Sequence, residues 1–120
     1  MYKVVYYKTG REELPFKEFI DKVDIKARVK IRKHVALLSI EGPNLKRPYA
    51  DYLRDGIHEL RIKFSPNEYR FLYFFFQRTD IVITHGFVKK TDKVLESEII
   101  KALKYKEDYE RRSKNEQKLL

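Results

Sequence analysis

The stretch "GIHELRIKFSPNEYRFLYFFF", residues 56–76, followed by "IVITHGFVKK", residues 81–90, carries the strand signals that decide the fold. Aromatic and β-branched residues dominate three runs, 57–64, 69–76 and 81–88, and the polar tetrapeptides "SPNE" and "QRTD" separate these runs. Short polar connections of this kind join neighbouring antiparallel strands. The sequence therefore predicts a three-stranded antiparallel meander.

The first turn sets the register of the first two strands. Because proline has a fixed φ, Pro66 excludes the primed two-residue turns and favours a four-residue loop. In that register Phe64 faces Tyr69, and Lys63 faces Arg70. Facing residues lie on one side of a sheet, so the two cations are expected to meet.

The second turn extends this face to the third strand. If the first and last residues of "QRTD" oppose each other, Leu72 faces His85 and Phe74 faces Ile83. One face then gathers the cationic and titratable side chains Arg61, Lys63, Arg70, His85 and Lys89. The opposite face gathers the expected core residues Leu60, Ile62, Phe64, Phe71, Tyr73, Phe75, Val82 and Val88.

The basic face is divided along its length. Its other end is apolar, with Phe74, Phe76, Ile81 and Ile83, and the helix expected after residue 96 is the local candidate to cover it. The basic end would then remain open as a cleft. Like charges directly opposed in a sheet repel each other unless an anion lies between them, and a phosphate would fit that place.

Helices are expected on both sides of these strands in the sequence. A first strand over 2–8 precedes a short helix that starts at Pro15, with the apolar stripe Phe16, Phe19, Ile20 and Val23. A second helix is expected over 25–41, with the stripe Ile25, Val29, Ala36 and Ile40. Residues 42–56, rich in proline and glycine, are expected to form a connecting loop.

The last element is a helix over 96–114, where Ile99, Ala102, Leu103, Tyr105 and Tyr109 recur at helical spacing. The element order strand, helix, helix, three strands, helix predicts an α+β domain, with helices against an antiparallel sheet. We assign it to residues 1–112, with 113–120 as a polar tail.

The amino-acid composition indicates which kinds of partner the protein binds. Lys and Arg total 27 against 18 Asp and Glu, which gives a net charge of +9 and a basic footprint typical of nucleic-acid binding. The sequence starts without the pattern of a signal peptide, its longest apolar run is 71–76, and it contains no cysteine. We therefore expect a cytoplasmic protein that uses no membrane.

The sequence contains no motif for binding a metal ion or a nucleotide. His34, His58 and His85 are scattered without metal-ligand spacing, and no glycine-rich loop precedes a helix. We expect no cofactor. A solvated surface is the plain alternative for the basic face, with Glu59 pairing structurally with Arg61.

Three ordered segments resemble the RelE superfamily of toxins from toxin–antitoxin modules, close to its HigB-like, phage-derived branch. They are "LRDGIHELRIKF", "YRFLYFF" and "ITHGFVKKTDKVLESEIIKAL", and the resemblance spans about residues 2–112. It implies the RelE-like fold, a small antiparallel sheet with two N-terminal helices and a C-terminal helix. It also implies a metal-independent, ribosome-dependent endoribonuclease that cuts mRNA.

The resemblance also implies site residues and partners. Arg61 and Arg70 match strand arginines of the family, and Lys89 and Lys90 match basic positions after the last strand. With His85, these are the expected catalytic residues, and Lys63 and Lys93 are expected RNA contacts. The tyrosine that some members carry after the last strand has no counterpart. Expected partners are mRNA on the ribosome and a cognate antitoxin of the helix-turn-helix kind.

Two other readings of the residues stay open. The chain can be a non-catalytic module of the same fold that binds nucleic acid or an antitoxin, because fold does not fix function. It can also be a structural domain whose basic surface is incidental.

Overall fold

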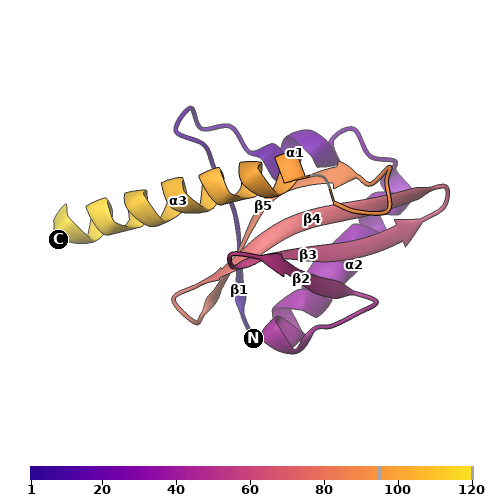
Figure 1. The fold of residues 1–120 in the computed structure, drawn as a ribbon, viewed down its shortest axis with the longest axis horizontal. Helices are drawn as coiled ribbons and strands as arrows, with labels where there is room; N and C mark the ends of the chain where they lie inside the picture. The colour runs from indigo at the N-terminus through magenta and orange to yellow at the C-terminus, as the bar shows by residue number, and fades with distance from the viewer. Residues whose placement is uncertain (95, 120) are drawn as a thin grey trace.

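A computed structural model describes residues 1–94 and 96–119, and it has the expected α+β architecture (Figure 1). The elements in chain order are β1 (Lys3–Tyr6), α1 (Pro15–Ile20), α2 (Ile25–Glu41), the short 3₁₀ helix η1 (Gly42–Asn44), β2 (Ala50–Arg54), β3 (Ile57–Phe64), β4 (Asn67–Phe76), β5 (Asp80–Val88) and α3 (Glu96–Leu119). The strands form a five-stranded sheet in the order β1-β5-β4-β3-β2, with β1 parallel to β5 and the other pairs antiparallel.

Strand β2 was not expected, because residues 42–56 looked like a loop. It pairs with β3 and forms the edge of the sheet. The turn between them consists of Asp55 and Gly56, whose φ angles are 50° and 82°. Positive φ at both central residues is the mark of the primed hairpin turn that Asp-Gly favours. That dipeptide was the available signal for β2.

The expected register of β3 and β4 is wrong by two residues, yet the faces are right. Phe64 pairs with Asn67, so Ser65 and Pro66 alone make the turn, and the peptide bond between them is cis. Arg70 therefore lies opposite Arg61, while Lys63 lies opposite Glu68. A shift by two leaves every side chain on its side of the sheet, because strand side chains alternate with period two.

The expected register of β4 and β5 holds only as far as Leu72, which pairs with His85. A bulge follows, so Phe74 pairs with Val82 instead of Ile83. Beyond it the expected faces of β5 are exchanged. Ile81 and Ile83 join the core under α2, and Val82 joins the one under α3. One extra residue reverses the alternation, and no residue pattern marked its place.

Helix α2 uses a different stripe from the expected one. Ala27, Ile31, Val35 and Leu38 are its buried residues. Ile25, Val29 and Ile40 from the expected stripe are 72%, 47% and 59% exposed. Both sets fit helical spacing, so periodicity alone could not choose between them.

Two hydrophobic cores lie on opposite faces of the sheet. Helices α1 and α2 cover one face, packing on residues such as Leu60, Ile62 and Phe71. Helix α3 covers the other through Ala102, Leu103 and Tyr105, which pack with Leu72 and Phe74. The cover expected from the last helix is thus confirmed for Phe74 and Phe76, whereas Ile81 and Ile83 lie in the other core.

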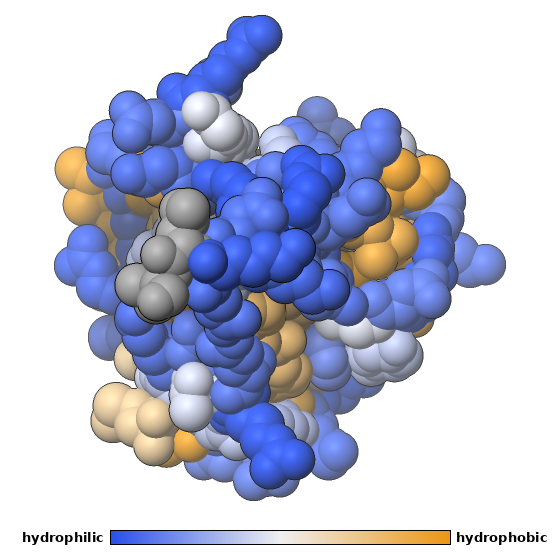
Figure 2. Space-filling model, turned by 90° about the vertical axis from the view of Figure 1, so that its left-hand side faces the viewer, coloured by the Kyte–Doolittle hydropathy of each residue, from blue (hydrophilic) through white to orange (hydrophobic). Residues whose placement is uncertain are grey.

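Helix α3 continues beyond the sheet and ends far from it (Figure 1). The stretch 113–119, which belongs to the expected polar tail, continues this helix. Viewed toward that end, the surface is mostly hydrophilic with small separate hydrophobic areas (Figure 2). No helix in the described part of the chain is long and apolar enough to cross a membrane.

A substitution at Gly86 tests how tightly α1 packs on the sheet. A Cβ at Gly86 would lie 2.4 Å from Cε1 of Phe71 and 3.0 Å from Cδ2 of Phe19. We predict that Gly86→Ala lowers the free energy of unfolding by about 1–3 kcal/mol, because the core under α1 must shift. Gly10→Ala is the matched control, since a Cβ there meets nothing within 4 Å. Equal urea midpoints for the two variants would contradict the packing.

Candidate functional site

A cleft of about 270 Å³ opens between β2, β3 and the segment that joins β5 to α3. It lies at the end of the sheet face that α3 leaves uncovered, where the basic cleft was expected. Its lining residues are Arg47, Asp51, Tyr52, Leu53, Arg54, Glu59, Arg61, Lys89, Asp92, Lys93, Val94 and Ile99. Three of the predicted site residues, Arg61, Lys89 and Lys93, are therefore brought together.

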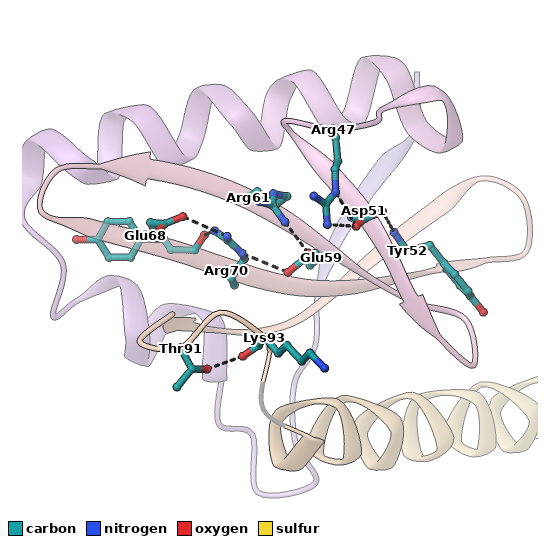
Figure 3. Close-up of polar contacts among 10 residues, drawn as sticks. Arg47, Asp51, Tyr52, Glu59, Arg61, Glu68, Arg70, Thr91 and Lys93 are labelled. Carbon is teal, nitrogen blue, oxygen red and sulfur yellow. Dashed lines mark hydrogen bonds and ion pairs between the residues drawn. The ribbon is translucent and has the colours of Figure 1, made fainter.

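The carboxylate of Glu59 lies between the two opposed arginines (Figure 3). Its Oε2 accepts a hydrogen bond from Nη1 of Arg61 at 3.0 Å, and its Oε1 lies 3.2 Å from Nε of Arg70. The anion expected between opposed cations is thus supplied by the protein itself. The pairing of Glu59 with Arg61, expected from the sequence, is confirmed.

Arg70 lies beneath the cleft, with a side chain that is only 1% exposed. Its guanidinium donates to the carbonyl of Tyr69 at 3.1 Å and to Oε1 of Glu68 at 3.3 Å. The hydrogen bond from Arg70 holds the pKa of Glu68 below its ordinary value. Surrounded in this way, Arg70 has no open path to a phosphate and can act on the cleft only through Glu59.

The two arginines on the rim of the cleft are also paired. Arg47 contacts Oδ2 of Asp51 through Nε at 2.9 Å and Nη2 at 2.8 Å, and Arg54 pairs with Asp55 and Glu96. Burial tends to raise the pKa of Asp51, but the hydrogen bonds from Arg47 and from the Tyr52 amide and the charges of Arg47 and Arg61 lower it overall. Asp51 therefore carries its negative charge at the cleft.

Lys89 and Lys93 supply the cations without a carboxylate partner. Within residues 1–94 and 96–119, no ion pair joins either ammonium to a carboxylate. The backbone between them is held locally: the Lys89 amide donates to the Glu68 carbonyl at 2.8 Å, and the Thr91 hydroxyl donates to the Lys93 carbonyl (Figure 3).

Two other predicted residues lie beside the cleft. Lys90 is exposed and lines a smaller hollow of about 90 Å³ that shares Lys89 and Lys93 with the cleft. Lys63 is exposed near the end of β3, where its charge helps to lower the pKa of Glu68. Neither of the two lines the cleft itself.

His85 is buried and does not line the cleft. Its Nδ1 lies 3.0 Å from Oγ1 of Thr84, and its Nε2 lies 3.0 Å from Oε1 of Glu98 at the start of α3. Burial lowers the pKa of His85, while the hydrogen bond to Glu98 opposes that change. The histidine links the sheet to α3.

Sequence reasoning missed several residues of the cleft: Arg47, Asp51, Tyr52 and Arg54. All of them come from the segment expected to be a loop. Because β2 was not recognised, their places on the sheet were not predicted. Among the described residues no group of three or more His, Cys, Asp or Glu side chains is arranged to hold a metal ion.

Comparison with known proteins places the chain in a family. The model of the family described as phage-derived Gp49-like proteins (DUF891) matches residues 18–107, which is well over half of the chain. The chain belongs to this family. The Gp49-like family is a RelE-like, toxin-like family, and the match includes every residue of the cleft. No curated protein matches the chain.

The buried pair in this Gp49-like protein gives a stability prediction. We predict that Arg70→Ala costs about 3–5 kcal/mol of unfolding free energy, because Glu59 loses its buried partner and keeps only the more exposed Arg61. Replacing both Arg70 and Glu59 by Met should cost less than Arg70→Ala, since the buried carboxylate leaves together with its buried partner, although Arg61 loses its ion pair. Chemical denaturation of the single and double variants measures this. A double variant as unstable as Arg70→Ala would contradict the assignment.

Burial also predicts a pH dependence. Because the folded-state pKa of His85 is lowered, the unfolded chain binds its proton more readily, and stability is lost as pH falls. Burial lowers the pKa of His34 and His58 as well. We predict that the unfolding free energy falls between about pH 7 and about pH 5, and that His85→Gln reduces this slope. An unchanged slope would exclude His85 as a contributor.

Proposed function

We propose that this protein is a HigB-like toxin, a ribosome-dependent endoribonuclease that cuts mRNA in the cytoplasm. The observation that carries the proposal is the cleft, in which Arg61, Lys89 and Lys93 converge beside the carboxylate of Glu59. Membership in a toxin-like family supports the same reading. The net charge of +9 favours attraction to RNA.

The proposed reaction needs only the RNA, water and the side chains of the cleft. The ribose 2′-oxygen attacks the adjacent phosphorus, a new P–O2′ bond forms, and the P–O5′ bond breaks. The products are a 2′,3′-cyclic phosphate and a 5′-hydroxyl. The proton of the 2′-hydroxyl passes to water in the open cleft, and Lys89 gives a proton to the leaving O5′.

Cations in the cleft stabilise the charge that develops on the phosphorane. Among the described residues the Arg61 side chain forms one hydrogen bond, to Glu59, so its other donors can face a phosphate. Lys93 lies across the cleft on the segment after β5 and binds the same or the next phosphate. Lys63 and Lys90 extend the basic surface outside the cleft as further RNA contacts.

Arg70 and His85 take positioning roles in this proposal. Arg70 holds Glu59 at the floor of the cleft, and His85 holds the first turn of α3 through Glu98. Neither side chain touches the RNA. The cognate partner proposed is a helix-turn-helix antitoxin that blocks the cleft or excludes the protein from the ribosome.

One observation favours a non-catalytic RNA-binding or antitoxin-binding module instead. Arg47, Arg54 and Arg61 each already pair with a carboxylate, which weakens the field available for a transition state. A binder needs only the general attraction that Lys89 and Lys93 supply. The two functions differ in one observable, which is the appearance of new RNA ends.

Purified protein added to a cell-free translation reaction tests the proposal. Primer extension on the message should reveal discrete new ends only when ribosomes are translating it. We predict that Arg61→Ala and Lys89→Ala each lower the rate of cleavage about a hundredfold, because each removes a donor to the transition state. Arg61→Ala should keep its fold, since Arg70 still compensates Glu59.

Lys33→Ala is the matched control, because Lys33 is an exposed lysine of α2, away from the cleft. It should cleave like the wild type. Intact message at high protein concentration would reject the nuclease and favour the binding module. Cleavage that persists in Arg61→Ala and Lys89→Ala would reject this cleft as the active site.

A further inference from the structure

A second hollow lies on the other side of the edge strand β2. It has a volume of about 340 Å³ and is lined by Pro43, Leu45, Lys46, Arg47, Ala50, Asp51, Tyr52 and His58. Arg47, Asp51 and Tyr52 also line the cleft, so the two spaces meet around the edge of the sheet. A chain lying in the cleft can continue into this hollow.

Two aromatic rings stand together in the hollow. Tyr52 pairs with His58 across β2 and β3, and their rings meet edge to face with centroids 5.0 Å apart. His58 is stacked on Tyr73 at 5.2 Å with an angle of 17° between the planes. The core therefore fixes His58, and burial lowers its pKa, so its ring is neutral near neutral pH.

Tyr52 is held in place although it faces solvent. It is 55% exposed, and its hydroxyl accepts a hydrogen bond from the Gly56 amide at 3.0 Å. In Figure 3 its ring points away from the ion pairs of the cleft. An anchored aromatic ring with an open face loses little conformational freedom when a planar ligand stacks on it.

Cations border these rings. Lys46 and Arg47 line the same hollow. Arg47 is paired with Asp51, which also lines it, while no carboxylate forms an ion pair with Lys46 in the part of the chain that the structure describes. Aromatic faces beside a positively charged groove are the pattern that binds single-stranded nucleic acid, because bases stack on rings and phosphates meet cations. An apolar protein side chain would have no use for the cations.

We propose that this hollow binds one unpaired base of the RNA whose scissile phosphate lies in the cleft. Tyr52 stacks on that base, and Lys46 and Arg47 contact its phosphate. This site rests on the proposed function, because it requires a single-stranded RNA in the cleft. It makes Tyr52 a binding residue with no part in the chemical step.

Binding of a fluorescent single-stranded oligoribonucleotide, followed by anisotropy, tests the stacking directly. We expect Tyr52→Leu to weaken binding about tenfold, which is within the range for loss of one stacked base. Tyr52→Phe keeps the ring and should bind much more tightly than Tyr52→Leu. An abasic ribose-phosphate oligomer of equal length should bind the wild type and Tyr52→Leu equally, because it offers no base to stack.

Tyr49→Leu is the matched control, because Tyr49 is 43% exposed in the same segment but does not line the hollow. It should bind RNA like the wild type, and thermal melting checks the fold of every variant. Unchanged binding by Tyr52→Leu, or an equal loss on the abasic oligomer, would overturn the base site while leaving the nuclease proposal intact. Failure of the wild type to bind the oligoribonucleotide would overturn the base site, and the translation assay would then judge the nuclease separately.

Discussion

The ion pairs of Glu59 with Arg61 and Arg70 are the constraint on which the cleft depends. Two arginines directly opposed on neighbouring strands would repel each other, and the register of β3 and β4 places Arg61 directly opposite Arg70. The carboxylate of Glu59, on the same face, forms an ion pair with each of them. Because Arg70 and Glu59 are almost completely buried, the pair is costly to break and fixes where Arg61 points.

Within this arrangement the cations of the cleft divide into two kinds. The arginines are paired and held in place by carboxylates on the sheet or on α3, so they shape the walls. Lys89 and Lys93 lie on the segment after β5, and within residues 1–94 and 96–119 neither forms an ion pair with a carboxylate. A rigid wall opposite free ammonium groups suits a polyanion that must be bound, held in one register and then released.

The sequence was sufficient for the fold class, the meander and the face shared by Arg61 and Lys89, because strand alternation survives a register error of two residues. The sequence was insufficient where a single inserted residue determines on which face of the sheet the following side chains lie. The bulge after Leu72 exchanged the faces of Ile81, Val82 and Ile83, and no residue pattern marked it. The Asp-Gly signal for β2 was present but outweighed by the prolines around it, and Arg47 and Tyr52 were lost with that strand.

The burial of individual side chains was the other property that could not be predicted from residue types. Arg70 and Arg61 share one face of the sheet and the same residue type, yet the first is buried and the second lines the cleft. His85 likewise shares the predicted face but is separated from the cleft, where it contacts Glu98 of α3. Which cations reach solvent depends on what α3 and the segment before it cover, and that is a tertiary property.

The most direct measurement is a structure of the protein on a ribosome whose mRNA carries a methyl group on the 2′-oxygen of the scissile nucleotide. The methyl group removes the attacking hydroxyl and holds the complex before cleavage. Our account predicts a phosphate within hydrogen-bond distance of Arg61, flanked by Lys89 and Lys93. A message that lies away from this cleft, with the protein bound through another face, would contradict it.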